Sequence, residues 1–228
     1  MTINIVSQID DRVRVKRALI SVSDKTGLEA FAPRLLEACP GLQILSTGGT
    51  FARLKEILGT KAKGCLTQVS DYTGQPETQG GLVKTLDFKL YLGLLTETHN
   101  PAHQADLQRT GAAAIDLVVV NLYPFAATVA TPGVTVEQAR GNIDIGGPCM
   151  IRAAAKNFIR VASVVDPADY TALAAELAGG GGTTSLALRY RLAQKAFEHT
   201  AAYDRAIADY LGERLYEDAR SCYDCGGV

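Results

Sequence analysis

Residues 141–157, GNIDIGGPCMIRAAAKN, combine an acid, a glycine pair and a lysine around the predicted start of a helix. The glycines at 146–147 can adopt backbone angles closed to other residues, and Pro148 suits the first turn of a helix. Free N–H groups at a helix start attract anions or a developing oxyanion. Asp144 lies just before this start and Lys156 lies inside the helix, so the segment is a candidate reaction site. The alternative is a glycine hinge before a core helix, with Lys156 in solvent.

Two loops that contain hydroxyls and glycines follow predicted strands. Ser23–Gly27 (SDKTG) follows the apolar run Arg17–Val22, and Ser46–Thr50 (STGGT) follows Leu42–Leu45. Hydroxyls and glycine N–H groups at a helix start can bind a phosphate, and the helix dipole adds attraction. Parallel strands end at one sheet edge, so the loops would lie side by side, with Lys25 as a further point charge. The loops lack the GK[ST] ending of a P-loop and the GxGxxG pattern, and ordinary Ser/Thr helix caps are the alternative.

Two further places put polar groups beside apolar sequence. Lys84 interrupts the apolar segment 81–95. A buried lysine is costly unless it has a partner, so Lys84 either extends to solvent or serves a ligand. The strongest predicted strand, Ile115–Val120, ends directly before Asn121 and Tyr123, which places both at the carboxyl edge of the sheet. The alternative for Tyr123 is an aromatic lid over the core.

The spacing of apolar residues predicts the elements that would position these groups, and it favours an α/β fold with a parallel sheet. Besides the strands named above, we expect helices at 28–39, 51–58, 100–109 and 135–140, strands at 65–69 and 160–165, and a turn-rich stretch at 71–81. We expect one domain over 1–228, with a core at about 15–178, a flexible glycine link at 179–184, a C-terminal helix at 185–212 and a tail at 213–228. The apolar face of that long helix should pack on the core or on a second subunit; it comprises Ala193, Ala196, Phe197, Thr200, Tyr203, Ile207 and Tyr210.

Composition narrows the class of protein. The chain has 228 residues, of which 47% are hydrophobic and 21% charged, and this is enough for a sizeable core. A net charge of -1 argues against a general nucleic-acid binder. The N-terminal segment does not resemble a signal peptide, and no run approaches the roughly 20 apolar residues of a membrane span. We therefore expect a cytoplasmic protein that binds neither nucleic acid nor membrane.

The cysteines and histidines do not indicate a metal site. The five cysteines are scattered and odd in number, unlike a disulfide framework. Cys222 and Cys225 form a CxxC in a polar, glycine-ended tail, but without a second ligand pair a disordered end is favoured over zinc. His99 and His103 lie in a polar segment and are expected at the surface. We expect no metal.

Seven motifs together resemble one known family. They are SVSDKTG, ILSTGGT, VSDYTG-PE, VKTL, VVVNLYPF, NIDIGG and RAAAKN, in this order between about Arg17 and Tyr210. This arrangement is similar to the IMP cyclohydrolase domain, the N-terminal half of the bifunctional purine-biosynthesis PurH proteins that also carry AICAR transformylase. The resemblance implies a methylglyoxal-synthase-like fold, with a mostly parallel sheet flanked by helices, and a homodimer. It also implies closure of the purine ring of FAICAR (5-formamidoimidazole-4-carboxamide ribonucleotide), with loss of water. The product is IMP, and the reaction is the last step of de novo purine biosynthesis. No metal or organic cofactor is implied.

The resemblance also assigns roles to residues of this chain. The positions that match the nucleotide-binding loops, chiefly at the phosphate, are Ser23, Asp24, Lys25, Ser46, Thr47, Gly48 and Gly49. The positions that match the surroundings of the base are Lys84, Thr85, Asn121, Tyr123, Asp144, Ile145 and Gly146. Lys156 matches the proton donor/acceptor of the family.

Ring closure explains why such a set is needed. The carboxamide nitrogen must lose a proton as it attacks the formyl carbon, and the formyl oxygen becomes an oxyanion before it leaves as water. Our hypothesis is that Lys156 transfers protons while Asp144 tunes its charge. Lys84 and the N–H groups near Gly146 would stabilise the oxyanion. Tyr123 would orient the carboxamide together with Asn121.

The chain departs from the family pattern in a few places. Leu82 stands where the family usually has an arginine, which removes a cationic donor near the ligand. Asp87 and Phe88 replace the usual His-Pro, and Tyr91 replaces a later histidine. The transformylase half is absent from the sequence, so we expect a separate AICAR transformylase to supply FAICAR.

Two other functions are compatible with the same fold. A non-catalytic regulatory module that binds IMP or another nucleotide would need the two phosphate loops, but not the four predicted catalytic residues together. Those residues are Lys84, Tyr123, Asp144 and Lys156. Methylglyoxal synthase would need catalytic Asp and His positions that this chain does not offer. We therefore favour the cyclohydrolase.

Overall fold

The computed structural model describes residues 5–76, 78 and 83–226. The turn-rich stretch expected at 71–81 is thus described only in part, and its first residues belong to helix α4 (Val69–Thr73). Leu82 lies outside the described residues.

A parallel sheet forms the centre of the molecule. In the described part of the chain, five strands pair in the order β4-β3-β2-β5-β6, and all neighbouring pairs are parallel. The strands are β2 (Arg17–Val22), β3 (Gln43–Ser46), β4 (Leu66–Gln68), β5 (Leu117–Asn121) and β6 (Ala162–Val164). Most residues of β2, β3, β5 and β6 are buried, as expected for parallel strands covered on both faces. The predicted α/β class is confirmed.

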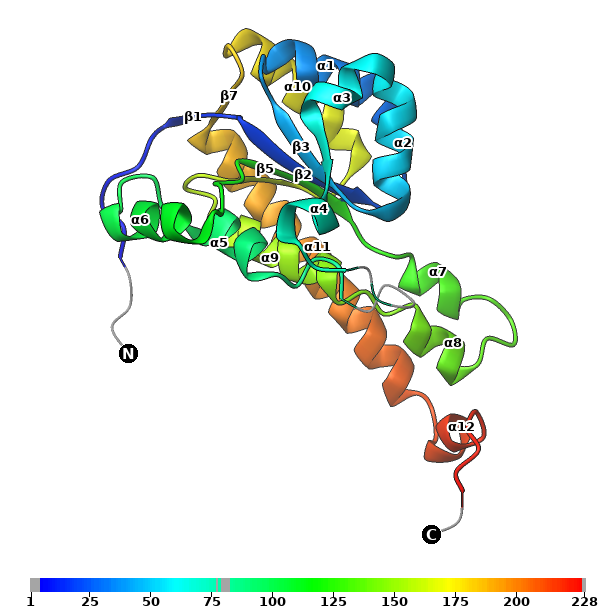
Figure 1. Cartoon of the computed structure of the whole chain (residues 1–228). Helices are drawn as coiled ribbons and strands as arrows, with labels where there is room; N and C mark the ends of the chain where they lie inside the picture. Colours follow the sequence, from blue (N-terminus) through cyan, green and yellow to red (C-terminus); the bar gives the residue numbers. More distant parts are fainter. Residues whose placement is uncertain (1–4, 77, 79–82, 227–228) are drawn as a thin grey trace.

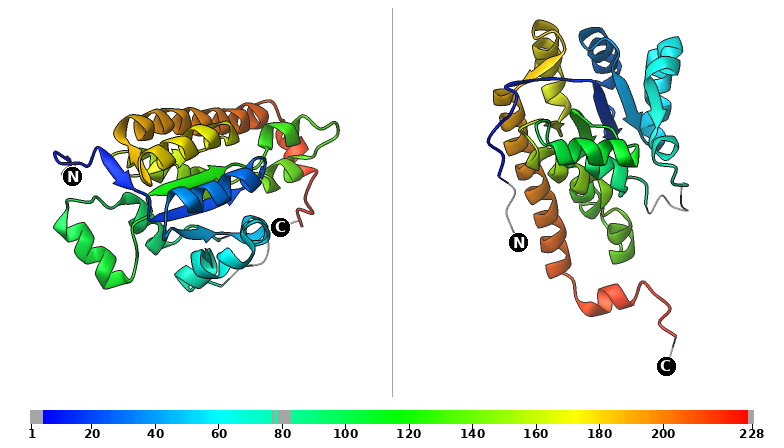
Figure 2. Two further views of the ribbon diagram at one scale, coloured as in Figure 1. Left: turned by 90° about the horizontal axis from the view of Figure 1, so that it is seen from above. Right: turned by 60° about the vertical axis from the view of Figure 1, so that its left-hand side comes forward.

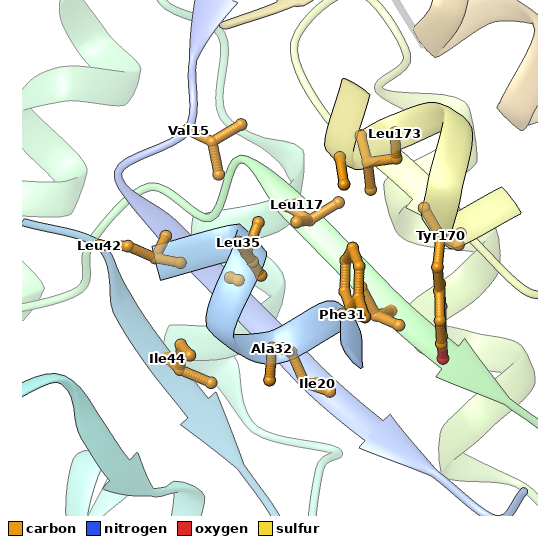
Figure 3. Close-up of a cluster of buried hydrophobic side chains, with 14 of the residues drawn as sticks. Val15, Ile20, Phe31, Ala32, Leu35, Leu42, Ile44, Leu117, Tyr170 and Leu173 are labelled. Atoms are coloured by element: carbon orange, nitrogen blue, oxygen red, sulfur yellow. The ribbon is translucent and has the colours of Figure 1, made fainter. Parts of the chain in front are cut away.

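Helices cover both faces of the sheet (Figures 1 and 2). One face carries α1 (Leu28–Ala38), α2 (Gly48–Leu58) and α10 (Tyr170–Gly179), and the other carries α5 (Phe88–Leu95), α9 (Gly146–Lys156) and α11 (Leu186–Gly212). On the first face the rings of Phe31 and Tyr170 stack with centroids 4.3 Å apart (Figure 3). On the second face, Ile151 and Ala154 of α9 pack with Ala193 and Ala196 of α11. Each helix therefore buries one apolar stripe against the sheet or a neighbouring helix.

The remaining elements connect these layers. They are η1 (Gly59–Lys61), α3 (Ala62–Cys65), α6 (Pro101–Thr110), α7 (Phe125–Val129), α8 (Val136–Gly141), η3 (Pro167–Asp169) and α12 (Tyr216–Arg220). The expected helices at 100–109 and 135–140 correspond to α6 and α8. Side chains cap both, since Asn100 precedes α6 and Thr135 forms a capping box with Gln138 before α8.

Several predicted boundaries were wrong by a few residues. Helix α2 begins at Gly48, not Phe51, because the glycines themselves form its first turn. The expected strand at 65–69 is shorter, since Cys65 ends α3 and Val69 begins α4. The apolar run at 160–165 contains only the three-residue strand β6, because the N–H groups of Arg160 and Val161 both donate to the carbonyl of Asn157 in the turn after α9.

The expected flexible glycine link is an ordered turn. The N–H of Gly182 donates to the carbonyl of Leu177 at 2.7 Å, and its carbonyl accepts from the N–H of Val15 at 2.9 Å. Gly181 and Gly182 have φ angles of 62° and 81°, in the left-handed region that glycine adopts at low cost. The chain then enters β7 (Thr183–Ser185), which pairs antiparallel with β1 (Arg12–Arg14). The short N-terminal partner strand, which has no strong apolar pattern, is what makes this region regular.

Arg189 fixes the start of the long helix α11. This arginine is fully buried, and its guanidinium donates to backbone carbonyls from three separate segments. The acceptors are Asp10, Asp11, Phe158, Ile159 and Thr184. One side chain therefore ties α11 to the N-terminal segment, to the turn before β6 and to β7.

The far half of α11 packs against α7 and α8. Tyr203 and Tyr210 both meet the ring of Phe125 edge-on, with centroid distances of 6.2 and 5.8 Å. Phe197, predicted on the same apolar face, is 40% exposed, so it does not pack fully on the core of its own chain. The expected disordered tail contains α12, and the hydroxyl of Tyr223 bonds to Glu137 of α8. No helix of the described residues has the length and apolar character that crossing a bilayer requires.

Candidate active site

A cleft of about 640 Å³ opens at the carboxyl ends of β2, β3 and β5, between the N-termini of α2 and α9. This is the edge of an α/β sheet at which ligands commonly bind. Of the residues predicted for the site, those that line the cleft are Ser23, Lys25, Thr47, Gly48, Gly49, Lys84, Thr85, Asn121, Tyr123, Asp144, Ile145 and Gly146. The structure thus brings together segments that are far apart in the sequence.

One end of the cleft is suited to an anion. Gly48 and Gly49 form the first turn of α2, where backbone N–H groups lack helical acceptors. A Cβ added at Gly48 would lie 3.8 Å from Lys84 Nζ, and one added at Gly49 would lie 3.9 Å from Lys25 Nζ. Two ammonium groups therefore flank the positive end of the helix dipole, as a phosphate site requires.

Lys84 and Thr85 span the two helix starts. The amine of Lys84 lies beside Gly48, whereas the buried Thr85 lies against α9, where a Cβ on Gly146 would overlap its Oγ1. Lys84 is exposed, in line with the alternative that it extends outward, but it extends into the cleft. Its position favours contact with the phosphate over the oxyanion role that we expected.

Asn121 holds the Ser23–Gly27 loop. Its Oδ1 accepts from the N–H groups of Ser23 at 2.6 Å and Asp24 at 2.9 Å, and its Nδ2 donates to the carbonyl of Asp24 at 2.8 Å. Asn121 therefore shapes the backbone that faces the cleft. It also lines the cleft, and its Nδ2 has a second N–H besides the one bonded to Asp24, so its role in orienting the carboxamide of a ligand stays a prediction.

Two other predicted binding residues direct their side chains away from the cleft. Ser46 is fully buried, and its Oγ donates to the carbonyl of Ile20 at 2.7 Å, which ties β3 to β2. Asp24 lines a neighbouring pocket of about 430 Å³ rather than the cleft. Hydrogen bonds from Thr26 lower the pKa of Asp24 below its ordinary value.

Asp144 is the acid of the cleft, and it caps the start of α9. Its Oδ1 accepts from the N–H of Gly147 at 2.8 Å, and the N–H of Tyr123 also bonds to it. Burial raises the pKa of Asp144 above its ordinary value, while these two hydrogen bonds oppose the rise. A Cβ at Gly147 would come within 2.6 Å of both this carboxylate and Leu122, so the close approach requires glycine. A half-buried carboxyl with a raised pKa is suited to proton transfer.

Tyr123 and Ile145 supply apolar surface at the cleft. Their exposed fractions are 50% and 58%, high for residues of this size. Tyr123 is therefore not a lid over the core, which was the alternative interpretation of it. An aromatic ring and an aliphatic side chain in one cleft suit a flat heterocyclic ligand.

Lys156 does not reach this cleft. It is exposed at the C-terminal end of α9, while the cleft lies at the N-terminal end. An unbroken helix rises about 1.5 Å per residue, so Lys156 and Gly146 lie roughly 15 Å apart along the axis. The expectation that Lys84, Asp144 and Lys156 converge was therefore wrong within one copy of the chain. Helix α9 is unbroken between the two residues, so Lys156 cannot fold back to the cleft.

The departures from the family pattern have structural roles where they are described. The Asp87 carboxylate accepts from the N–H groups of Lys89 at 2.7 Å and Leu90 at 3.4 Å, and so caps α5. Phe88 is 64% exposed, and the ring of Tyr91 packs against the buried apolar residues of α5, α9 and α11 on the second face of the sheet. Among the described residues, no group of three or more His, Cys, Asp or Glu side chains is arranged to hold a metal ion.

Two polar cleft residues outside the predicted loops were missed by the sequence analysis. The hydroxyls of Ser21 and Thr47 lie 2.7 Å apart and join the two loop-bearing strands. A polar residue near the end of an apolar strand was the available signal for Ser21. Arg140 also lines the cleft, and Glu137 accepts two hydrogen bonds of 2.6 Å from its guanidinium. An exposed arginine on a short helix gives no such signal.

Comparison with known proteins identifies the family. Residues 27–149 match the model of the MGS-like domain, which covers more than half of the chain. The chain belongs to the MGS-like domain family. Residues 154–224 of this MGS-like chain match a second model, described as AICARFT/IMPCHase bienzyme.

The two PurH relatives are longer proteins. The Bifunctional purine biosynthesis protein PurH of Neisseria meningitidis serogroup A / serotype 4A (strain DSM 15465 / Z2491) is 51% identical over 197 residues, which are 86% of this chain and 36% of that protein. The protein of the same name from Chlorobium phaeovibrioides (strain DSM 265 / 1930) is 51% identical over 199 residues, with 87% and 37% covered. The MGS-like chain therefore spans little more than a third of these curated relatives. The crystal structure of ForH superposes with a TM-score of 0.74 at 34% identity, covering 86% of this chain and 96% of that one.

Proposed function

We propose that this MGS-like chain is an IMP cyclohydrolase, which closes the ring of FAICAR to give IMP and water. The observation that carries the proposal is one cleft with an anion site at one end and a half-buried acid at the other. Lys25 and Lys84 flank α2 at the first end, and Asp144 caps α9 at the second. The 51% identity to two PurH proteins and the IMPCHase part of the matched family model support it.

The arrangement of the cleft suits ring closure. With the ribonucleotide phosphate at α2, its base would extend toward Tyr123, Ile145 and Asp144. In this proposal Asp144 takes the proton that the carboxamide nitrogen loses as its bond to the formyl carbon forms. The N-terminus of α9 stabilises the oxyanion, to which Asp144 returns this proton. The formamido nitrogen supplies the second proton, and the oxygen leaves as water when its bond to the former formyl carbon breaks. Both reacting groups belong to one substrate, so holding them together provides much of the acceleration. The reaction needs no cofactor.

A role for Lys156 requires a second copy of the chain. The resemblance gives this lysine the proton donor/acceptor function, yet its own cleft lies at the other end of α9. We propose a homodimer in which Lys156 serves the cleft of the neighbouring copy. The outer face of α11 supports an interface, because Tyr190, Phe197 and Leu211 are 51%, 40% and 49% exposed and follow one another at spacings of seven and fourteen residues, which places them on one side of the helix.

The partner enzymes and the location remain proposals. In this proposal an AICAR transformylase supplies FAICAR. The two PurH relatives are called bifunctional. That the transformylase is a separate chain here stays a prediction. A cytoplasmic location stays a prediction too.

The decisive experiment incubates the purified chain with FAICAR and follows the absorbance of IMP. We expect the wild type to convert FAICAR and the Asp144→Asn variant to lose this turnover. Binding of IMP without turnover of FAICAR would instead favour a regulatory module. A parallel assay with dihydroxyacetone phosphate tests the methylglyoxal synthase alternative, for which no product is expected.

A further inference from the structure

The long helix α11 contacts the loop that carries Asp144. The hydroxyl of Tyr203 accepts a 2.8 Å hydrogen bond from the backbone N–H of Asp144 and lies 3.4 Å from the carbonyl of Asn142, to which it donates. Tyr203 thus bridges both sides of Ile143 in the short connection between α8 and α9. A residue of the C-terminal helix therefore supports the loop of the cleft acid, although the two residues are far apart in the sequence.

The ring of Tyr203 is held in place. It is half-buried and packs edge-on against Phe125, with a centroid distance of 6.2 Å and an angle of 69° between the rings. Partly buried Ile143 and Ile207 belong to the same cluster. Burial raises the pKa of Tyr203 above its ordinary value, so the hydroxyl keeps its proton at neutral pH. The packing therefore fixes the position of the hydroxyl, and the hydroxyl stays protonated at neutral pH.

We propose that Tyr203 is a positioning residue that sets the backbone at Asp144 and so aims its carboxylate into the cleft. The inference rests on the proposed function, since it assigns a purpose to the position of Asp144. Tyr203 does not line the cleft, so it acts through Asp144 and not on the ligand. Without its hydroxyl, the N–H of Asp144 loses its acceptor and the loop gains freedom just before α9.

The chain offers a matched control on the same helix. Tyr210 meets Phe125 with the same edge-on geometry, at 5.8 Å and 86°. Its hydroxyl is also buried, but it has no hydrogen-bond partner among the described residues. Replacing either tyrosine by phenylalanine keeps the ring contact, and only Tyr203→Phe removes a bond to the loop.

Steady-state kinetics with FAICAR test the proposal. Tyr203→Phe should lower kcat by roughly 5- to 50-fold and change KM by less than about twofold. Tyr210→Phe should change both by less than about twofold. The acid limb of the pH profile should shift in Tyr203→Phe alone. If the two variants have the same kcat and the same pH profile, the proposal is wrong.

A second measurement separates this inference from the proposed function. The carboxyl carbon of Asp144 can be titrated by NMR in the wild type and in both variants, which needs no turnover. A changed titration in Tyr203→Phe alone supports the positioning role even if the wild type does not convert FAICAR. An unchanged titration in Tyr203→Phe overturns it even if the wild type does. Thermal melts of both variants show whether either change is only a loss of stability.

Discussion

The amine of Lys84 lies beside Gly48, the first residue of α2, although the two residues come from different segments of the chain. A Cβ on the glycine would be 3.8 Å from Lys84 Nζ. The lysine therefore adds a full charge to the partial positive charge of the helix start. This pairing defines the anion end of the cleft and leads to the first two predictions.

Lys84→Met should weaken binding of the nucleotide more than it slows the reaction. We expect KM for FAICAR and Kd for IMP to rise by roughly 10- to 100-fold, because one ammonium leaves the phosphate site. Lys55→Met is the control, since Lys55 is exposed at the opposite end of the same helix. Calorimetric titration with IMP measures the affinities. If Lys84→Met keeps the affinity for IMP and lowers only kcat, its role lies at the oxyanion after all.

Gly48→Ala should lose nucleotide binding, whereas Gly41→Ala should lose only stability. Both glycines have positive φ angles, 42° and 80°, so alanine costs about 1–2 kcal/mol of folding stability at either place. Only the side chain at 48 would enter the cleft, since a Cβ at 41 meets nothing within 4 Å. Denaturant melts and IMP titrations of both variants test this. Equal affinities in the two variants would remove Gly48 from the binding site.

Asp144→Asn should lower kcat by roughly 10²- to 10³-fold with little change in KM. Because burial raises the pKa of Asp144, activity should fall on acidification at a pH above the ordinary value of 3.8. That acid limb should vanish in the variant and persist in Asp106→Asn, a surface change on α6. A profile of kcat against pH in both variants would show it. An acid limb that survives Asp144→Asn would assign the titration to another group.

The same substitution should stabilise the protein at neutral pH. A carboxyl whose pKa is raised on folding binds its proton more tightly in the folded state. Its contribution to the free energy of unfolding is thus fully present below the unfolded pKa and is lost as the pH rises through the folded one. Asparagine carries no charge to desolvate, so the Tm of Asp144→Asn should exceed that of the wild type at pH 7 and not at pH 3. A lower Tm at pH 7 would contradict the direction of the shift.

Lys156→Ala should lower kcat by roughly 10²- to 10⁴-fold while binding of IMP survives. Mixing it with Asp144→Asn tests whether the lysine acts between copies. A mixed dimer would contain one intact site, so about a quarter of wild-type activity should return after subunit exchange. Mixing Asp144→Asn with Lys84→Met should give no more activity than the two variants show separately, because both residues line one cleft and a mixed dimer gains no intact site. Lack of recovery in the first mixture would exclude action in trans, and unchanged turnover in Lys156→Ala would exclude any role.

The sequence predicted the sheet and both loops because buried parallel strands leave long apolar runs with polar residues directly after them. Lys25, Thr47 and Gly48 were placed correctly for this reason. The role of Asn121 could not be read from the sequence, because an amide at a strand end can face either a ligand or the neighbouring loop. Lys156 was misplaced because motif order does not give distance, and an intact helix separates two residues that stand in adjoining motifs.

The anchoring of α11 has a consequence for how this protein can vary. Arg189 fixes the helix at one end of the molecule, and Tyr203 uses the same helix to support Asp144 at the other. The rotation of the helix about its axis therefore determines where the Tyr203 hydroxyl holds the loop that carries Asp144. Deleting a single residue between these two anchors would swing the tyrosyl hydroxyl by about 100° around the axis. Natural variants should accordingly tolerate substitutions along this stretch and reject changes of its length, although none of its residues touches the ligand site.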